Sequence, residues 1–289
     1  MTKILITGAT GFIGSHLFDL LLSEGFDVCG ISNTRTKKYI SKIPLHDKNT
    51  LNSYFKKNNF DVVIHLASII DDKDSLKILH NNYSCTMNIL ETCVKNNVPN
   101  FIFTSSHAVY GKTNYLPIDE KHSTNPQSAY GITKLIEENL CRFFQNHFNL
   151  NTIILRITSV YGENQDKKKL IPNLILNGEK IILHKYKNGF QIMDMIHVND
   201  VCNSILCCLK NKKNSAVYNI ATGVPITVKE IAENVQKINH SKIIIKNLVH
   251  KTNHFTYDTT KAKQNLKFTS KVNFEKNFQT LFDGIIQNN

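Results

Sequence analysis

The sequence has 289 residues, of which 41% are hydrophobic and 20% are charged, a balance typical of a folded globular chain. No apolar run reaches the roughly 18 residues that a membrane-spanning helix needs. The first apolar stretch is interrupted at Gly8 and Gly11 and carries no small-residue cleavage site, unlike a secretory signal. These features predict a cytoplasmic protein with no membrane partner.

The net charge of +12 raises the question of a nucleic-acid partner. The excess is almost entirely lysine, since the only arginines are Arg35, Arg142 and Arg156, and the basic residues are dispersed along the chain. Nucleic-acid readers usually gather arginine on one surface. We therefore expect no nucleic-acid partner, and a solvated lysine surface that can also attract an anionic substrate.

The seven cysteines occur without a C-x-x-C pair. Neither a disulfide framework nor a metal site is indicated, and reduced, packed thiols are expected.

Strand and helix patterns alternate through the first half of the chain. Buried strands are predicted at 3–7, 27–31, 61–67, 100–105 and 152–157, with helices around 17–25, 50–57 and 85–95 and another from residue 129. Strands separated by helices of this length form a parallel sheet with right-handed crossovers. The expected fold class is therefore α/β, with a Rossmann-type doubly wound sheet.

The pattern loosens beyond residue 162. Helices are predicted near 170–177, 198–209, from 227 and from 273, and strands near 180–184, 217–220 and 242–245. We expect a dinucleotide-binding domain over 1–163 and a smaller α+β substrate lobe over 164–289, with segments near 190–222 returning to the first domain.

A glycine-rich turn lies between the first strand and the first helix. Gly8 permits the tight turn, Gly11 lets the backbone approach a pyrophosphate, and Gly14 allows close helix packing. The adjoining Phe12 and Ile13 begin the helix, whose N-terminus favours an anion. The turn predicts a bound NAD or NADP.

The end of the second strand bears on the choice between these cofactors. An acidic residue there usually binds the adenosine ribose, but the chain has Ser32, Asn33 and Arg35 instead. Serine and asparagine could bond a 2′-phosphate and arginine could pair with it, which slightly favours NADP. The alternative is a surface loop beside an NAD site.

Tyr130 and Lys134 stand four residues apart at the start of a predicted helix, so they share one face. A phenol titrates near pH 10 in water and needs a neighbouring cation to act as an acid or base at neutral pH. Lys134 supplies such a cation and could also hold the nicotinamide ribose. The pair is a candidate catalytic centre.

Several segments in order resemble the extended short-chain dehydrogenase/reductase family, in its nucleotide-sugar epimerase, dehydratase and reductase branch. They are GATGFIG at 8–14, DVVIHLAS at 61–68, TSSHAVYG at 104–111, AYGITK at 129–134, LRITSVYG at 155–162, DMIHVND at 194–200, VYNIATG at 217–223 and DTTKAKQNL at 258–266.

The resemblance implies site residues and a reaction. Ser106 completes a catalytic triad with Tyr130 and Lys134, and four further residues contact the cofactor, namely Leu66, Ala67, Asn82 and Thr104. Tyr130 takes a proton from a sugar hydroxyl, usually at C4, as hydride moves to the nicotinamide. Reduction of the 4-keto sugar on its other face is epimerisation, and reduction of a 4-keto substrate is ketoreduction. A homodimer through helices near 85–96 and 129–147 is also implied, with Leu140, Phe143 and Phe144 either in the seam or in the core.

Three residues depart from the family pattern. Met193 replaces an arginine that commonly binds the substrate diphosphate, Ser159 replaces a substrate-binding asparagine, and Pro44 replaces an aspartate near adenine. Lys169, Lys185 or Lys187 could compensate, although each fits a solvated lysine better. Met193 keeps open a reductase of a non-nucleotide carbonyl compound.

The two residues after Ser106 narrow the reaction. The family's 4,6-dehydratases carry an acid pair there, and its C3/C5 epimerases carry a cysteine second, whereas this chain has His107 and Ala108. His107 is a candidate substrate contact, with a packing role favoured. We expect a nucleotide-sugar 4-epimerase, with a 4-ketoreductase as the alternative and a non-catalytic cofactor-binding regulator as the least favoured hypothesis.

Overall fold

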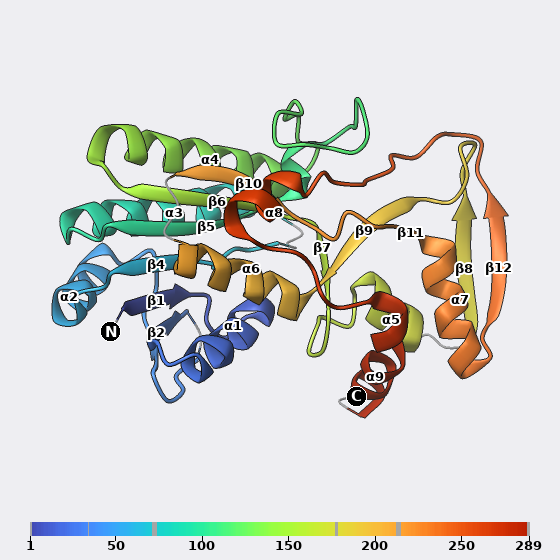
Figure 1. Cartoon of the computed structure of the whole chain (residues 1–289), viewed down its shortest axis with the longest axis horizontal. Coiled ribbons are helices and arrows are strands. Elements are labelled where there is room, and N and C mark those ends of the chain that lie inside the picture. The colour runs from blue at the N-terminus through green and yellow to red at the C-terminus, as the bar shows by residue number, and fades with distance from the viewer. Residues whose placement is uncertain (1, 34, 71–73, 177–178, 212–214, 288–289) are drawn as a thin grey trace.

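The computed structural model describes residues 2–33, 35–70, 74–176, 179–211 and 215–287. Within these residues the central feature is a seven-stranded parallel sheet in the order β10-β6-β5-β4-β1-β2-β3 (Figure 1). Its strands are β1 (Lys3–Thr7), β2 (Asp27–Ser32), β3 (Ile40–Lys42), β4 (Val62–His65), β5 (Asn100–Ser106), β6 (Asn151–Ile157) and β10 (Ala216–Ile220). The predicted Rossmann-type sheet is confirmed.

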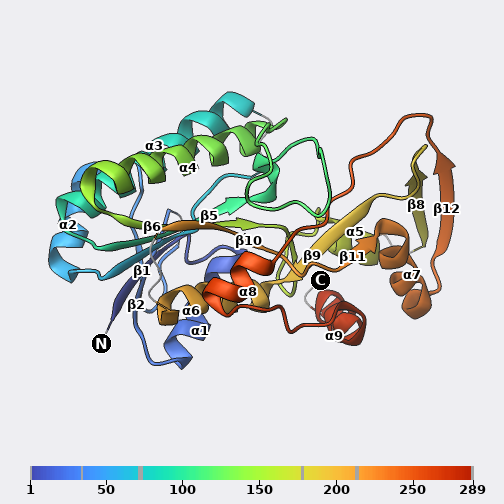
Figure 2. The ribbon, with the colours of Figure 1, turned by 45° about the horizontal axis from the view of Figure 1, so that its top comes forward.

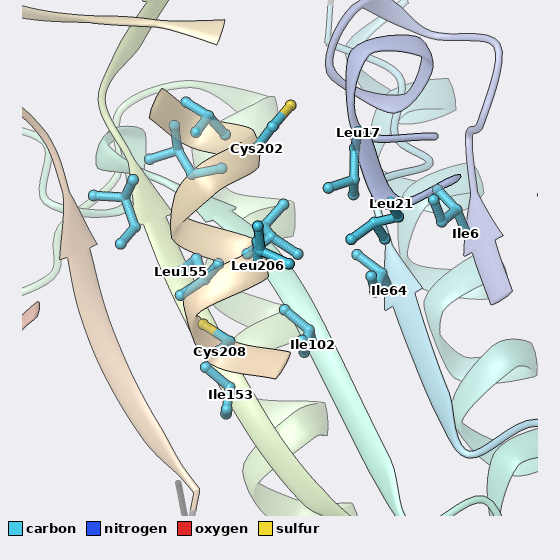
Figure 3. Close-up of a cluster of buried hydrophobic side chains, with 14 of the residues drawn as sticks. Ile6, Leu17, Leu21, Ile64, Ile102, Ile153, Leu155, Cys202, Leu206 and Cys208 are labelled. Carbon is cyan, nitrogen blue, oxygen red and sulfur yellow. The ribbon is translucent and has the colours of Figure 1, made fainter. Parts of the chain in front are cut away.

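Helices cover both faces of the sheet. One face carries α1 (Phe12–Ser23), α6 (Val198–Asn211) and α8 (Thr260–Leu266), and the other carries α2 (Lys48–Asn58), α3 (Ser75–Lys95) and α4 (Ala129–Phe148) (Figures 1 and 2). Successive strand side chains point to opposite faces, so the apolar strands feed two cores. Figure 3 shows one of them, in which Leu17 and Leu21 of α1 lie near Ile6 and Ile64, and Leu206 of α6 lies near Ile102.

Helix α3 begins ten residues before the predicted helix near 85–95. Asp74 caps it by accepting hydrogen bonds from the backbone N–H groups of Leu76 and Lys77. Most side chains in the first turns are exposed or half-buried, so the Asp74 cap, rather than a buried apolar face, sets where this helix begins.

A smaller lobe lies beside the carboxyl ends of the sheet strands. It contains a three-stranded sheet of β7 (Ser159–Tyr161), β9 (Ile192–His197) and β11 (Pro225–Thr227), and a parallel pair of β8 (Lys180–Lys185) and β12 (Lys242–Asn247). Helices α5 (Leu170–Leu176), α7 (Val228–Asn239) and α9 (Phe274–Gln287) enclose one apolar cluster with these strands. The predicted helix end at residue 177 lies outside the described residues.

Several short elements were not predicted. They are β3, β7, β9, β11, α8 and the 3₁₀ turn η1 (His107–Val109). All have three to seven residues, which is too few for a periodic pattern to stand out.

The strand order reverses beside β1, which pairs with β2 on one side and β4 on the other. Open α/β sheets bind ligands in the crevice at such a switch point, beyond the carboxyl ends of the strands. None of the helices in the described segments is long and apolar enough to cross a membrane. The same segments bring no three His, Cys, Asp or Glu side chains together as a metal site.

Candidate active site

The glycine-rich turn connects β1 to α1 at the switch point. Gly8 has φ +69°, and a Cβ there would lie 2.9 Å from the backbone of Ala67. A Cβ on Gly14 would lie 2.2 Å from the Gly8 carbonyl oxygen. Both positions therefore require glycine. Gly11 caps α1 without a side-chain hydrogen bond, so the first-turn N–H groups, which have no partner within a helix, can receive an anionic ligand.

The loop after β2 holds the residues considered for a 2′-phosphate. Ser32 is buried, and its hydroxyl lies 2.9 Å from the Thr10 hydroxyl of the glycine turn. The backbone N–H of Arg35 donates to the same Ser32 oxygen at 3.3 Å. Asn33 and Arg35 are exposed. The loop thus lies against the glycine turn, with the arginine side chain in solvent.

Ser106, Tyr130 and Lys134 come together at the carboxyl end of β5 and the start of α4. Ser106 accepts a hydrogen bond from the Ala108 N–H at 3.2 Å, which leaves its hydroxyl proton free to donate. The Ser106 side chain lowers the pKa of the Tyr130 phenol through hydrogen bonding, and Lys134 Nζ lies 5.8 Å from the centre of the Tyr130 ring. The predicted triad residues are therefore neighbours in space.

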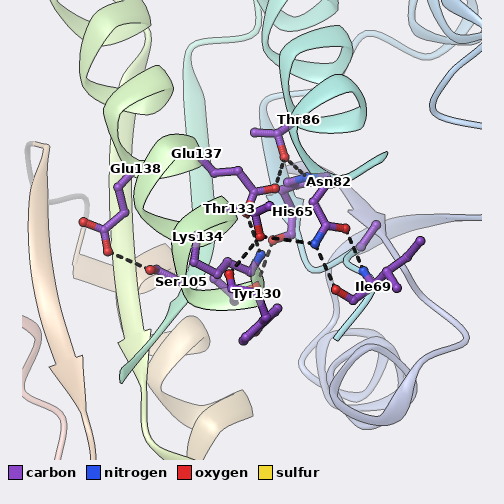
Figure 4. A network of polar contacts seen from close by, with 12 residues as sticks. His65, Ile69, Asn82, Thr86, Ser105, Tyr130, Thr133, Lys134, Glu137 and Glu138 are labelled. Atoms are coloured by element: carbon purple, nitrogen blue, oxygen red, sulfur yellow. Dashed lines mark hydrogen bonds and ion pairs between the residues drawn. The ribbon is translucent and has the colours of Figure 1, made fainter. Parts of the chain in front are cut away.

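Lys134 is only 1% exposed and has a carboxylate partner. Its Nζ lies 3.1 Å from Glu137 Oε2 and 4.6 Å from the centre of the Phe103 ring. Burial alone would lower the pKa of Lys134, but the Glu137 charge raises it above its usual value. The pKa of Tyr130 is raised by burial, with Lys134 lowering it and Glu137 raising it. Figure 4 shows this cluster between α3 and α4.

Asn82 of α3 organises the segment that follows β4. Its amide accepts a hydrogen bond from the Ile69 N–H at 2.8 Å and donates to the Ile69 carbonyl at 2.9 Å (Figure 4). Leu66 and Ala67 lie half-buried at the start of this segment, against the glycine turn. Thr104 of β5 donates to the His65 carbonyl at 3.0 Å. Leu66, Ala67 and Thr104 therefore lie at the ends of β4 and β5, and Asn82 reaches the same place from α3.

His107 is half-buried and packs against aromatic rings. Its ring contacts the rings of Phe255 and Tyr257, with centroids 5.7 and 6.0 Å away, and burial lowers the pKa of His107 to about 4. Its Nδ1 makes no hydrogen bond within the described residues. A neutral, packed imidazole of this kind is a poor general acid.

The remaining substrate candidates lie in the smaller lobe. Ser159 begins β7 and pairs in register with Met195. Met193 in β9 pairs with Ile226 and packs against the apolar cluster of the lobe. Lys169, Lys185 and Lys187 are exposed. These positions do not test whether the five residues contact a substrate, so the contacts stay predictions.

Three buried residues of the cluster were not singled out from the sequence: His65, Thr86 and Glu137. His65 Nδ1 lies 2.7 Å from the Thr7 hydroxyl, and His65 Nε2 lies 3.0 Å from the Thr86 hydroxyl. Thr86 donates to Glu137 Oε1 at 2.5 Å. One signal was present for Glu137, because it follows Tyr130 and Lys134 at helical spacing on the same face.

The glycine turn at the switch point and the Tyr130–Lys134 pair at the sheet edge define a nucleotide-binding oxidoreductase fold of the short-chain dehydrogenase/reductase type. The model of the NAD-dependent epimerase/dehydratase family matches residues 4–221. The chain belongs to this family of enzymes, as its sequence motifs predicted.

Curated relatives and a solved structure agree with this assignment. The chain is 35% identical over 248 residues to a proposed UDP-glucose 4-epimerase of Methanocaldococcus jannaschii, covering 79% of each chain. It is 31% identical over 273 residues to the dTDP-D-glucose 4,6-dehydratase of Dictyostelium discoideum, covering 82% of this chain and 62% of that protein. The structure of the UDP-glucuronic acid 4-epimerase of Bacillus cereus, in complex with UDP-glucuronic acid and NAD, is 27% identical, has a TM-score of 0.88 and covers 100% of both chains.

The residues at the switch point fit a nicotinamide dinucleotide. The turn has no room for a Cβ at Gly8 or Gly14, and the helix behind it begins with no side-chain cap. Ser68 Oγ, just past β4, is buried without a hydrogen-bond partner in the described part of the chain. A buried hydroxyl with no partner is costly, so a polar ligand group beside it is expected.

Proposed function

We propose that this protein is an NAD(P)-dependent nucleotide-sugar 4-epimerase. The observation that carries the proposal is the contact of Ser106 with Tyr130 beside Lys134, with Ala108 where an acid would be needed for other reactions of the family. The similarity to a UDP-sugar 4-epimerase over the whole chain supports the same reaction.

The chain supplies the proton chemistry of the reaction. Tyr130 removes the proton of the sugar C4 hydroxyl, and Ser106 hydrogen-bonds the same oxygen and holds it in line. The Lys134 ammonium favours the phenolate through its positive charge. A nicotinamide ring bound at the glycine turn would supply the hydride acceptor and donor that the reaction needs.

Elimination of water does not fit this site. It requires one group to take the C5 proton and another to protonate the departing hydroxide. Ala108 has no titratable group, and His107 is neutral and packed against aromatic rings. Hydride transfer at C4 needs neither residue.

For the cofactor we propose acceptance of NADP as well as NAD. No carboxylate stands at the end of β2 to repel a 2′-phosphate, and Arg35 extends into solvent from a loop held against the glycine turn. An arginine in this position can form a charge-assisted bond with a phosphate.

The test is to incubate the purified protein, with NAD and with NADP, with UDP-, dTDP- and GDP-hexoses and to resolve the products by chromatography and mass. An isomer of unchanged mass supports the 4-epimerase. A product that has lost one water overturns the assignment. In a second incubation, with NADPH and a nucleotide 4-keto sugar, net consumption of NADPH without isomerisation of the hexoses identifies the 4-ketoreductase instead.

Met193 favours a second candidate, a reductase of a non-nucleotide carbonyl compound. A methionine packed into the lobe's apolar cluster cannot hold a diphosphate as an arginine would. Carbonyl reduction that proceeds equally well without a nucleotide on the substrate would support this candidate.

We also propose a homodimer through α3 and α4. Ile132, Ile136 and Phe143 form an exposed apolar stripe on α4, with exposed fractions of 39%, 37% and 47%. Phe144 lies in the core and Leu140 packs against the core, so Phe143 is the one residue of the three considered from the sequence that lies on this stripe. Sedimentation as a monomer at micromolar concentration would contradict the dimer.

A further inference from the structure

A directed hydrogen-bond chain connects the glycine turn to Lys134. Its members are Thr7, His65, Thr86 and Glu137, which come from β1, β4, α3 and α4 and are all buried. Figure 4 shows the last three. The proposed epimerase chemistry uses none of them. A buried carboxylate is costly unless it is paired, so the role of Glu137 calls for an explanation.

The donors in this chain can be assigned from chemistry. A carboxylate only accepts, so the Thr86 hydroxyl proton goes to Glu137 Oε1. A hydroxyl has a single proton, so Thr86 must accept from His65 Nε2–H. His65 Nδ1 then accepts from Thr7, whose oxygen already accepts the N–H groups of Leu66 and Ala67.

This series of hydrogen bonds therefore fixes Oε1 of Glu137 and turns Oε2 toward Lys134. Oε2 lies 3.1 Å from Lys134 Nζ but makes no well-aligned hydrogen bond within the described residues. The contact is an electrostatic pairing of a buried cation with a buried anion, on the same helix face as Tyr130.

We propose that Glu137 is a positioning residue of the active site: its carboxylate, held by Thr86, anchors the Lys134 ammonium and keeps the Tyr130–Lys134 pair fully protonated in the unliganded protein at neutral pH. The inference deepens the proposed function, since it concerns the same pair, but it can be tested without a sugar substrate. It is compatible with Tyr130 as the base, because a bound oxidised nicotinamide would add a positive charge that favours the phenolate.

The other titratable groups around the pair are either neutral or already paired with an opposite charge. Burial, and then the Lys134 charge, lower the pKa of His65 in β4 to about 3. Burial and the Glu137 charge raise the pKa of Cys85 in α3 to about 11, and burial raises that of Cys141 in α4. The neighbouring Glu138 is neutralised by Arg156. Lys134 and Glu137 are thus the charges that act on Tyr130.

Removal of the Glu137 carboxylate should lower the pH at which the Tyr130–Lys134 pair titrates. A negative charge makes proton loss from either member of the pair harder, so the pH at which the pair loses its first proton must fall when Glu137 becomes neutral. This holds whether the first proton leaves Tyr130 or Lys134, because the step belongs to the coupled pair. A charge within about 4–6 Å moves a titration by about 1–3 units, so we expect a fall of at least about one pH unit.

The experiment is a pH titration by NMR of the unliganded protein carrying ¹³C-labelled tyrosine and lysine side chains. Tyr130→Phe and Lys134→Met assign the two signals. In the wild-type protein both signals should remain in the protonated form through the neutral range. Titration of Tyr130 near neutral pH in the wild type would overturn the proposal, and this measurement needs no Glu137 variant to fold.

Variants at Glu137 separate charge from structure. Glu137→Gln should lower the midpoint of the titration. Glu137→Asp should bring the midpoint most of the way back, because the negative charge returns. Thr86→Val removes the hydrogen bond but keeps the charge, so it should shift the midpoint much less. A midpoint unchanged in Glu137→Gln, or shifted equally by Thr86→Val, would show a merely structural carboxylate.

The pH profile of turnover gives a second readout where a substrate is turned over. The acidic limb of kcat/KM, which reports the enzyme free of sugar, should move to lower pH in Glu137→Gln, in the same direction as the NMR midpoint. If no sugar reacts, the proposed function fails while the titration still tests Glu137.

Discussion

The two lobes stabilise themselves in different ways. The sheet edge near α4 buries charged and polar groups that hold one another, among them Lys134, Glu137, Glu138 and Arg156. The smaller lobe encloses an apolar cluster, and its lysines and glutamates lie at the surface. Its buried carboxylate, Asp194 of β9, is held by hydrogen bonds from Thr222 and Gly223. Removal of a buried charge leaves its partner buried and unpaired. After removal of a surface charge, water solvates the partner that remains. Equivalent substitutions should therefore cost far more at the sheet edge.

Loss of the Arg156–Glu138 ion pair should cause the largest fall in the free energy of unfolding. Arg156 bonds both carboxylate oxygens of Glu138, at 2.9 and 2.8 Å, with both side chains buried. Burial alone would raise the pKa of Glu138, but the Arg156 hydrogen bonds and charge hold it below its usual value. Arg156→Met should lower the free energy of unfolding by about 3–5 kcal/mol, measured by urea denaturation.

Arg142 provides the matched control, because it bonds the same Glu138 Oε2 at 2.7 Å but its side chain is 39% exposed. Arg142→Met should cost only about 0–1 kcal/mol, as exposed ion pairs do. Equal losses for the two arginines would show that burial does not set the cost.

Tyr130→Phe should separate chemistry from stability at the same sheet edge. Loss of a general acid or base typically lowers turnover by at least about 100-fold, while the lost hydrogen bond to Ser106 is worth only about 0.5–1.5 kcal/mol of folding free energy. Cofactor affinity should be nearly unchanged. Near-wild-type turnover would remove Tyr130 from the proposed reaction.

The sequence predicted the parts of the site that depend on local spacing. Gly8, Gly11 and Gly14 stand between a strand and a helix, and Tyr130 and Lys134 are one helical turn apart. Such patterns are visible because the residues that act together are also neighbours in the chain.

The buried hydrogen-bond chain could not be predicted in the same way. Thr7, His65, Thr86 and Glu137 are 58, 21 and 51 residues apart, and they meet only after β1 pairs with β4 and α3 packs on α4. The smaller lobe was also predicted incompletely, since β7, β9 and β11 are short and depend on their partners.

Arg35 is an exposed charge that we expect to matter for binding of NADP and not for folding. If it pairs with a 2′-phosphate, Arg35→Ala should weaken NADP binding about tenfold to a hundredfold, since a charge-assisted bond is worth about 1.5–3 kcal/mol. NAD binding and unfolding should barely change. Titration calorimetry with both cofactors measures this, and Lys37→Ala, an exposed cation two residues along, is the control. Equal loss for the two cofactors would mean that the loop only borders the site.

The smallest effect is expected at the capped start of α7 in the smaller lobe. Thr227 Oγ1 accepts the Glu230 N–H at 3.1 Å, and Glu230 Oε2 accepts the Thr227 N–H at 2.7 Å. Thr227→Ala should cost about 1 kcal/mol. The Thr227 hydrogen bonds lower the pKa of Glu230, so this stabilisation is present above the carboxyl's unfolded pKa, about 4.3, and is lost as the pH falls through the folded value. Urea denaturation of both proteins should therefore show a smaller difference in acid than at neutral pH. A difference that stays constant, or that reaches the cost of Arg156→Met, would contradict the contrast between the lobes.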